Sequence, residues 1–230
     1  MPFSDAVRRQ TRDDHERAER SPFIGALIGG HLHRRAHAEL LRALLPVYVA
    51  LEQELAAHAD EASIGLFDHR RLDRRDRIAG DLRTVGQDPG STSAALLPAT
   101  SAYVSIVRAS VASPQRLLAH HYTRYLGDMA GGRIIASRLM SEYDIAPEAL
   151  TYYDFSALGD VHHYRRQYKA ILDLVPWSDA ERAEFVAECI VAYRANAVLF
   201  DELAAHTGMS TGAASTPGSF LARERRHSLR

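Results

Sequence analysis

The segment Tyr122-Thr-Arg-Tyr-Leu-Gly-Asp-Met-Ala-Gly-Gly-Arg133 decides how the rest of the chain is interpreted. It lies within a helix-like stretch, about residues 114–143, and yet contains three glycines and a carboxylate. A glycine inside a helix costs about 1 kcal/mol relative to alanine. Gly127 and Gly131 share one helix face, so they predict a kink or a flat ligand lying against bare main chain beside Asp128. The alternative is a glycine-mediated helix crossing with a solvated Asp128.

Composition indicates one globular domain. The 230 residues are 46% hydrophobic and 25% charged, and the net charge of −1 offers no general attraction for nucleic acid or an anionic membrane. A single cysteine, Cys189, excludes an internal disulfide and fits a reducing, cytoplasmic compartment. No apolar run is long enough to span a membrane. We expect a helical domain over residues 1–207 and a disordered tail over residues 208–230.

Hydrophobic periodicity predicts an all-α fold, because neither β-alternation nor an internal repeat is present. Ser4 and Thr100 are expected N-caps, and Ser178 with Glu181 forms a capping box. Residues 87–98 and 144–159 are expected to be connectors. The predicted helices are 4–20, Phe23 to Ile28, 34–58, 70–85, 100–111, 114–143, 160–174 and 178–206.

Twelve histidines raise the question of a metal site. A di-iron carboxylate bundle needs two Glu-x-x-His pairs on facing helices. The nearest pairs, Glu54 with His58 and Glu202 with His206, are one residue too wide and lie at helix ends. Most histidines are therefore interpreted as surface or structural residues.

His15 has a more specific setting. Glu19 follows one helical turn later, where its carboxylate could hydrogen-bond the imidazole and fix its tautomer. Arg8 precedes it by two turns on nearly the same face. The alternative is an exposed histidine in a charged helix.

The chain resembles the haem oxygenase family over nearly its whole length, to about His206. The segment from Tyr122 to Gly132 differs from the family pattern Tyr-Thr-Arg-Tyr-Leu-Gly-Asp-Leu-Ser-Gly-Gly at Met129 and Ala130 only. The His15 segment, Tyr48-Val-Ala-Leu-Glu and Asn196-Ala-Val-Leu-Phe-Asp-Glu-Leu support the resemblance.

The resemblance implies a role for each matching residue. His15 would be the proximal ligand of haem iron, with Glu19 beside it, and haem would lie between the first helix and a glycine-kinked distal helix. Gly127 and Gly131 would bring main chain close to the porphyrin, and Asp128 would hold a distal water network. Tyr48, Arg124 and Asn196 match positions around that network. The remaining matches are Arg8, Tyr122, Arg165 and Lys169 at the haem propionates, Phe200 at the pocket wall, and Phe23 and Ile24 on the proximal side.

Residue chemistry agrees with these roles. A single neutral imidazole leaves the opposite face of haem iron open to oxygen. Arg165 and Lys169 are four residues apart, on one helix face, where their cations suit a pair of carboxylates. Met129 conserves the volume of leucine, whereas Ala130 removes a hydroxyl near the expected kink.

The implied function is oxidation of haem, as both substrate and cofactor, to biliverdin, carbon monoxide and ferrous iron with oxygen. Electrons would come from an external donor, a ferredoxin or flavin reductase system, because no dinucleotide fingerprint is present. Without the C-terminal anchor of membrane-bound members, a soluble, bacterial-type form is expected. The rivals are a haem carrier that does not degrade its ligand and a helical thiamine-processing enzyme, which would need Cys189 as a reactive thiol.

Overall fold

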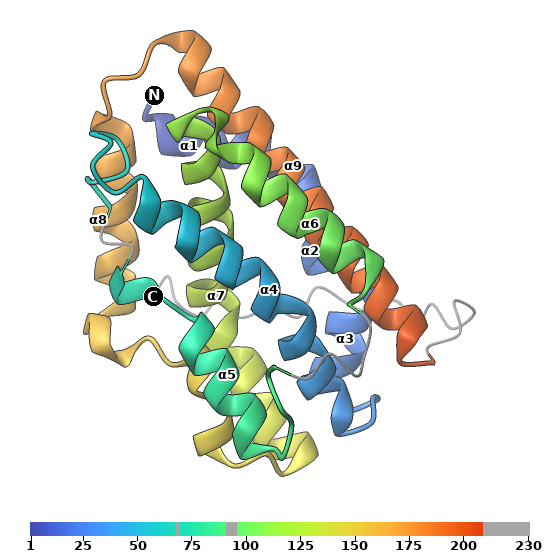
Figure 1. The fold of residues 1–230 in the computed structure, drawn as a ribbon. Coiled ribbons are helices and arrows are strands. Elements are labelled where there is room, and N and C mark those ends of the chain that lie inside the picture. The colour runs from blue at the N-terminus through green and yellow to red at the C-terminus, as the bar shows by residue number, and fades with distance from the viewer. Residues whose placement is uncertain (68–69, 91–95, 209–230) are drawn as a thin grey trace.

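The computed structural model describes residues 1–67, 70–90 and 96–208, and this part of the chain is helical without strands (Figure 1). The predicted all-α class is confirmed. The tail from residue 209 and part of the 87–98 connector lie outside the described residues. The helices are α1 Phe3–Gln10, α2 Arg12–Glu19, α3 Pro22–Ile28, α4 Arg35–Ala57, α5 Arg75–Thr84, α6 Pro98–Ala109, α7 Pro114–Tyr143, α8 Val161–Leu174 and α9 Asp179–His206, with short 3-10 turns η1 Arg70–Leu72, η2 Ser110–Ala112, η3 Pro147–Ala149, η4 Thr151–Tyr153 and η5 Ser156–Leu158.

Helices α4, α7 and α9 form the centre of the molecule. Helix α9 packs on α7, α6, α2 and α3, while α4 packs on α6, α5 and α7 (Figure 1). Their apolar faces bury Leu41, Leu51 and Leu199 completely. The expected site residues on α2, α4, α7 and α9 therefore belong to helices that share one core.

The first predicted helix is in fact two helices, α1 and α2, separated at Thr11. The Thr11 hydroxyl donates to the carbonyl of Val7 at 2.9 Å, and the side chain is buried. Such a bond to the preceding turn competes with regular helix geometry. The expectation of one helix over residues 4–20 was wrong, because the backbone at Thr11 has φ −100° and ψ 4° and so leaves helical geometry there.

Two predicted N-caps were also wrong. Ser4 lies inside α1, where its N–H and hydroxyl both donate to Asp173 of α8, at 2.6 and 3.1 Å. Helix α6 begins at Pro98, which lacks an N–H, and the N–H of Ala99 donates to Glu202 Oε2 at 2.6 Å. Thr100 instead donates its hydroxyl to a carbonyl of α4. In both helices a carboxylate from a distant helix accepts an N–H group of the first turn, as a local cap residue was expected to do.

The predicted helix over residues 70–85 is divided for a similar reason. The buried carboxylate of Glu52 accepts the N–H groups of Arg74 and Arg75, at 2.6 and 3.1 Å, so α5 begins at Arg75. Burial raises the pKa of Glu52 to about 7. The capping box of Ser178 and Glu181 is confirmed at the start of α9.

Helix α7 continues through its three glycines without interruption. A Cβ at Gly132 would lie 3.3 Å from Tyr153 Cδ1, so this glycine allows η4 to approach the helix. Gly127 and Gly131 have no such neighbour among the described residues: apart from the adjoining backbone of α7, a Cβ at either position would meet no atom of this part of the chain within 4 Å. Packing against η4 therefore explains Gly132, but it does not explain Gly127 or Gly131.

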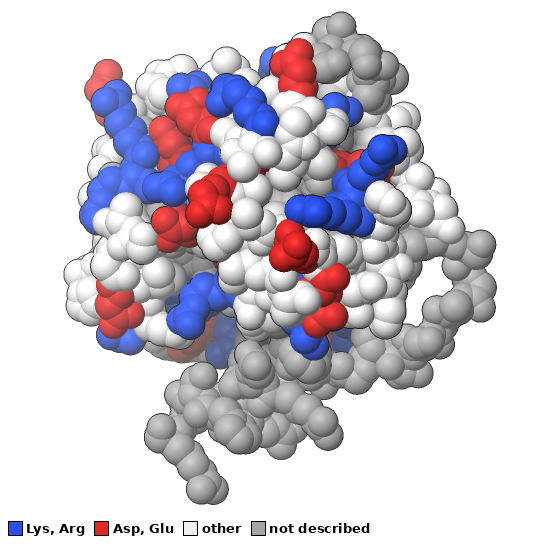
Figure 2. All heavy atoms as spheres, turned by 90° about the horizontal axis from the view of Figure 1, so that it is seen from below, with Lys and Arg blue, Asp and Glu red and all other residues white. Residues whose placement is uncertain are grey.

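Acidic and basic side chains are interspersed over the face of the molecule seen in Figure 2. This mixture agrees with the net charge of −1. Among the residues that the structure describes, none of the helices combines the length and the apolar character that crossing a membrane requires.

His37 gives a prediction about stability. It is 1% exposed, neither ring nitrogen has a hydrogen-bond partner among the described residues, and burial lowers its pKa from 6.5 to about 4. Below pH 6.5 the unfolded chain binds a proton that the folded chain excludes, so His37 reduces the free energy of unfolding as the pH falls toward 4. This difference in pKa corresponds to about 3 kcal/mol at full effect.

We therefore expect His37→Phe, which keeps a ring beside Tyr153, to become more stable relative to wild type as the pH falls from 6.5 to 4. Urea unfolding at a series of pH values measures this difference and cancels the opposite contribution of Glu52, which both proteins share. His33→Gln, in the exposed segment before α4, is the control. A difference that does not change with pH would contradict the prediction.

Candidate functional site

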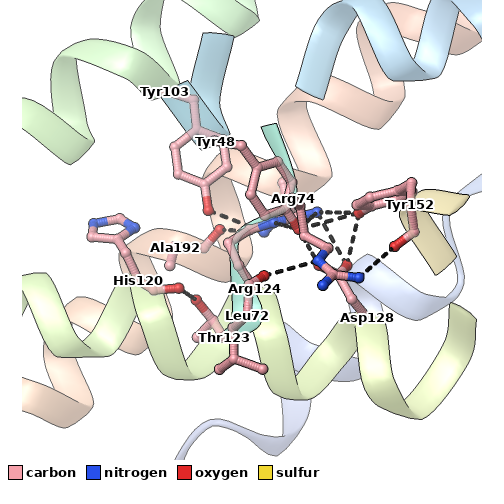
Figure 3. Close-up of polar contacts among 11 residues, drawn as sticks. Tyr48, Leu72, Arg74, Tyr103, His120, Thr123, Arg124, Asp128, Tyr152 and Ala192 are labelled. Carbon is pink, nitrogen blue, oxygen red and sulfur yellow. Dashed lines mark hydrogen bonds and ion pairs between the residues drawn. The ribbon is translucent and has the colours of Figure 1, made fainter. Parts of the chain in front are cut away.

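Asp128 lies in the middle of α7 with its side chain 12% exposed, and three donors surround its carboxylate (Figure 3). Tyr48 of α4 donates to Oδ2 and Tyr152 of η4 donates to Oδ1 at 2.9 Å. Arg124, one turn earlier on α7, lies 3.3 Å from Oδ1. The solvated Asp128 of the alternative interpretation is therefore excluded, because residues of α4, η4 and α7 itself hold this side chain.

Arg124 is the centre of the network. Its guanidinium is buried and donates to the hydroxyls of Tyr48 and Tyr152, at 3.0 and 3.1 Å, and to the side-chain oxygen of Asn196 on α9. Burial alone would lower the pKa of Arg124, but the phenolic oxygens and the Asp128 carboxylate outweigh it and raise the pKa. Arg124 therefore remains a cation that links α4, α7, η4 and α9.

The network extends away from Asp128 through Asn196. Its amide nitrogen donates to the Ala192 carbonyl at 3.0 Å and to the Tyr103 hydroxyl at 3.3 Å. Burial raises the pKa of Tyr103 to about 12 and raises that of Tyr48 well above its ordinary value. These phenols therefore keep their protons and act as fixed hydrogen-bonding groups.

Next to this network the main chain of α7 is open. Gly127 is exposed and Gly131 is half-buried, and no residue of the described ranges outside this stretch of α7 comes within 4 Å of the space where their side chains would lie. A hollow of about 300 Å³ also adjoins Asp128, between α7 and the connector that contains Tyr153 and Phe155. A flat ligand can approach the glycine face closely, and water has room beside the carboxylate.

His15 lies on α2, which packs against α9. Its Nε2 is 3.5 Å from Glu19 Oε1, and its ring meets Tyr193 edge-on, with 5.2 Å between the ring centroids. The side chain is 30% exposed. A carboxylate beside one ring nitrogen orients an imidazole and increases its basicity as a ligand. The spacing from His15 to Glu19 thus predicted a contact that the structure contains.

Arg165 and Arg8, two of the residues expected at the propionates, lie close to Tyr122. Burial raises the pKa of Tyr122, and the positive charges of Arg165 and Arg8 lie close enough to oppose this effect. Arg8 is on α1, which is joined to α8 by the bonds from Ser4 to Asp173. Lys169 lies one turn after Arg165 on α8. Three helices therefore bring cations and a phenol to the same end of the molecule.

The apolar residues expected around the pocket occupy two places. Phe23 and Ile24 are buried in α3, at 0% and 8% exposure. Phe200 is half-buried on α9, one turn after Asn196, and packs against the core.

Two rival sites lack the features they need. Cys189 is fully buried, and burial raises the pKa of its thiol well above the ordinary value, so it is not the reactive thiol of a thiamine-processing enzyme. Among the described residues there is also no group of three histidine, cysteine, aspartate or glutamate side chains placed to hold a metal ion.

The sequence did not identify Tyr152 or Tyr103 as site residues. Both are tyrosines in segments with ordinary helix or connector patterns, and neither has a local motif. The pair Tyr152-Tyr153 followed by Phe155 was the only signal, and it does not tell which ring faces Asp128.

The fold and this site define an all-α protein built around a glycine-bearing helix with a buried carboxylate network. The family model described as Heme oxygenase matches residues 1–202. The chain belongs to the haem oxygenase family.

Its relatives span most of its length. A heme oxygenase from Rhodella violacea is 30% identical over 199 residues, which cover 86% of this chain and 85% of that protein. Heme oxygenase-2 from Synechocystis, solved with heme and NO, has 26% identity and a TM-score of 0.85 over 92% of this chain and 89% of that one. The heme oxygenase structure from Leptospira interrogans has 28% identity and a TM-score of 0.82, and the match covers 88% of this chain and 100% of that chain.

Proposed function

We propose that this chain cleaves haem to biliverdin, carbon monoxide and ferrous iron, using oxygen and electrons from a separate reductase. Membership of the family and the haem complexes of related structures support the proposal. The single observation that carries it is the Asp128 carboxylate, held by Tyr48, Tyr152 and Arg124 beside an open glycine face. A protein that only binds haem does not need a carboxylate that is held in place by three donors.

Each group has a part that follows from its position. Haem, when bound, supplies the iron at which oxygen is activated and the ring that is oxidised. His15, oriented by Glu19, would hold the haem iron, and Gly127 and Gly131 would allow the main chain of α7 to lie against the ring. Asp128 would hold water through the lone pairs that its protein donors leave available, and so deliver protons through that water.

The experiment that separates an oxygenase from a haem carrier uses the full chain with hemin, ascorbate and air. An oxygenase loses the Soret band and gains bile-pigment absorption, whereas a carrier keeps the Soret band. Chromatography of the extracted pigment confirms that a linear tetrapyrrole has formed. Persistence of the Soret band, with a competent oxygenase assayed in parallel, would reject the proposal.

We also propose that a ferredoxin or flavin reductase system supplies the electrons, since the sequence contains no dinucleotide fingerprint. Its single cysteine and ordinary composition favour a reducing, cytoplasmic setting. The product set serves either iron acquisition or the disposal of excess haem.

Arg165 and Lys169 give a prediction about haem orientation. Changing both to Gln should weaken haem binding about tenfold and yield a mixture of biliverdin isomers, because two cations on one face of α8 then no longer hold the propionates. Haem titration and chromatography of the pigment measure the two effects. Arg166→Gln, the exposed neighbouring cation, is the matched control. Unchanged affinity with one unchanged isomer would contradict the clamp.

A further inference from the structure

Tyr152 is a second phenol on the Asp128 carboxylate. Its hydroxyl donates to Oδ1 at 2.9 Å, accepts from Arg124 Nη2 at 3.1 Å and lies 3.1 Å from the hydroxyl of Tyr48 (Figure 3). The side chain is 2% exposed. The contacts come from η4, a turn in the connector before α8, and not from any of the long helices.

The direction of these hydrogen bonds is fixed by Arg124. A guanidinium has five donors and no acceptor, so the phenolic oxygens of Tyr48 and Tyr152 accept from it. Each phenol has a single proton, and this proton is left for the carboxylate: that of Tyr48 for Oδ2 and that of Tyr152 for Oδ1. Each carboxylate oxygen of Asp128 therefore accepts a hydrogen bond from one phenol. The two phenolic oxygens lie close together, and neither phenol has a second proton to donate to the other.

The position of Tyr152 is fixed from α5. The completely buried carboxylate of Asp81 accepts the N–H of Tyr152 at 2.8 Å, and the N–H and hydroxyl of Thr151 at 3.0 and 2.6 Å. Arg74, just before α5, donates to the Asp154 carbonyl at 2.7 Å. The turn that presents the phenol is thus held on both sides of Tyr152.

We propose that Tyr152, held in place by Asp81, is a positioning residue of the oxidation site: it fixes the rotation of the Asp128 carboxylate so that water bound there faces the open glycine surface. This inference rests on the proposed function and adds a residue to it. Tyr48 alone would fix Oδ2 and leave the Oδ1 side to Arg124, whose long side chain also donates to Asn196 and Tyr48. With both phenols present, the carboxylate has one orientation.

The test compares Tyr152→Phe with Tyr153→Phe in the full chain. Both changes remove one buried phenolic oxygen, but the hydroxyl of Tyr153 has no hydrogen-bond partner among the described residues. For Tyr152→Phe we expect unchanged haem affinity and ring opening about tenfold slower, equivalent to about 1.4 kcal/mol. The midpoint of the pH-dependent change in the visible spectrum of the ferric complex should also shift, because the water beside Asp128 is no longer held in one orientation. Tyr153→Phe should match wild type in all three measurements.

Wild-type values for both the rate and the midpoint in Tyr152→Phe would overturn the inference, and so would equal losses in the two variants. A wild-type protein that forms no bile pigment would instead refute the proposed function, and the spectral midpoint would still test Tyr152 in the haem complex.

Asp81→Asn is the second variant, remote from Asp128. It should shift the midpoint in the same direction and add nothing to Tyr152→Phe, whereas additive shifts would show that Asp81 does not act through Tyr152.

Discussion

Asp128→Asn should reduce the rate of ring opening by roughly a hundredfold while haem still binds, because general acid–base assistance typically contributes a factor of 10² to 10⁴. Asparagine keeps the size of the side chain but replaces one acceptor oxygen with an N–H₂ group. That group would face the hydroxyl of Tyr48 or Tyr152, or the guanidinium of Arg124, each of which donates to the carboxylate. Either the Tyr48 hydroxyl, or both the Tyr152 hydroxyl and the Arg124 guanidinium, then lose their acceptor, and water beside the side chain loses its fixed orientation.

The measurement is the rate of bile-pigment formation with ascorbate and air, alongside a haem titration and the circular dichroism spectrum. Asp144→Asn is the matched control, since Asp144 ends α7 in the left-handed conformation, which asparagine also adopts, and it is exposed. The control should behave as wild type. Full pigment yield from Asp128→Asn would show that the carboxylate does not organise proton delivery, even though its partners remain in place.

The sequence predicted those parts of the site that depend on neighbours along one helix. Glu19 lies beside His15 and Lys169 lies one turn from Arg165, because residues four apart share a helix face. The capping box at Ser178 is equally local. The haem-related roles of His15, Arg165 and Lys169 are implied by the resemblance to a family, and substitutions of these three residues test them.

The contacts that the sequence did not predict join residues far apart in the chain. The bond from the Tyr152 N–H to Asp81 crosses 71 positions, and the bond from the Arg74 N–H to Glu52 crosses 22. Neither carboxylate has a motif, because its partner is a main-chain N–H group and every residue except proline has one. Such pairs are set by how α4, α5 and the connector pack, and this information is not contained in a helical period.

His15→Ala should remove the histidine-ligated ferric and ferrous spectra and abolish ring opening. The reason is geometric: α2 presents this imidazole with Glu19 beside one nitrogen and the ring of Tyr193 against its edge, so both its direction and its tautomer are held. Alanine removes the ligand but little of the packing, since α2 buries none of its residues fully. The variant should therefore fold, and its circular dichroism spectrum should match that of wild type.

Added imidazole separates loss of the ligand from loss of the pocket. A small molecule can enter the space that the side chain vacates beside Tyr193 and should restore the histidine-type spectrum together with part of the ring opening. His206→Ala, at the exposed end of α9, should change neither property. A wild-type spectrum in His15→Ala without imidazole would place the iron ligand on another residue. The glycine face of α7 and the Asp128 network would then have to serve a haem bound in a different orientation.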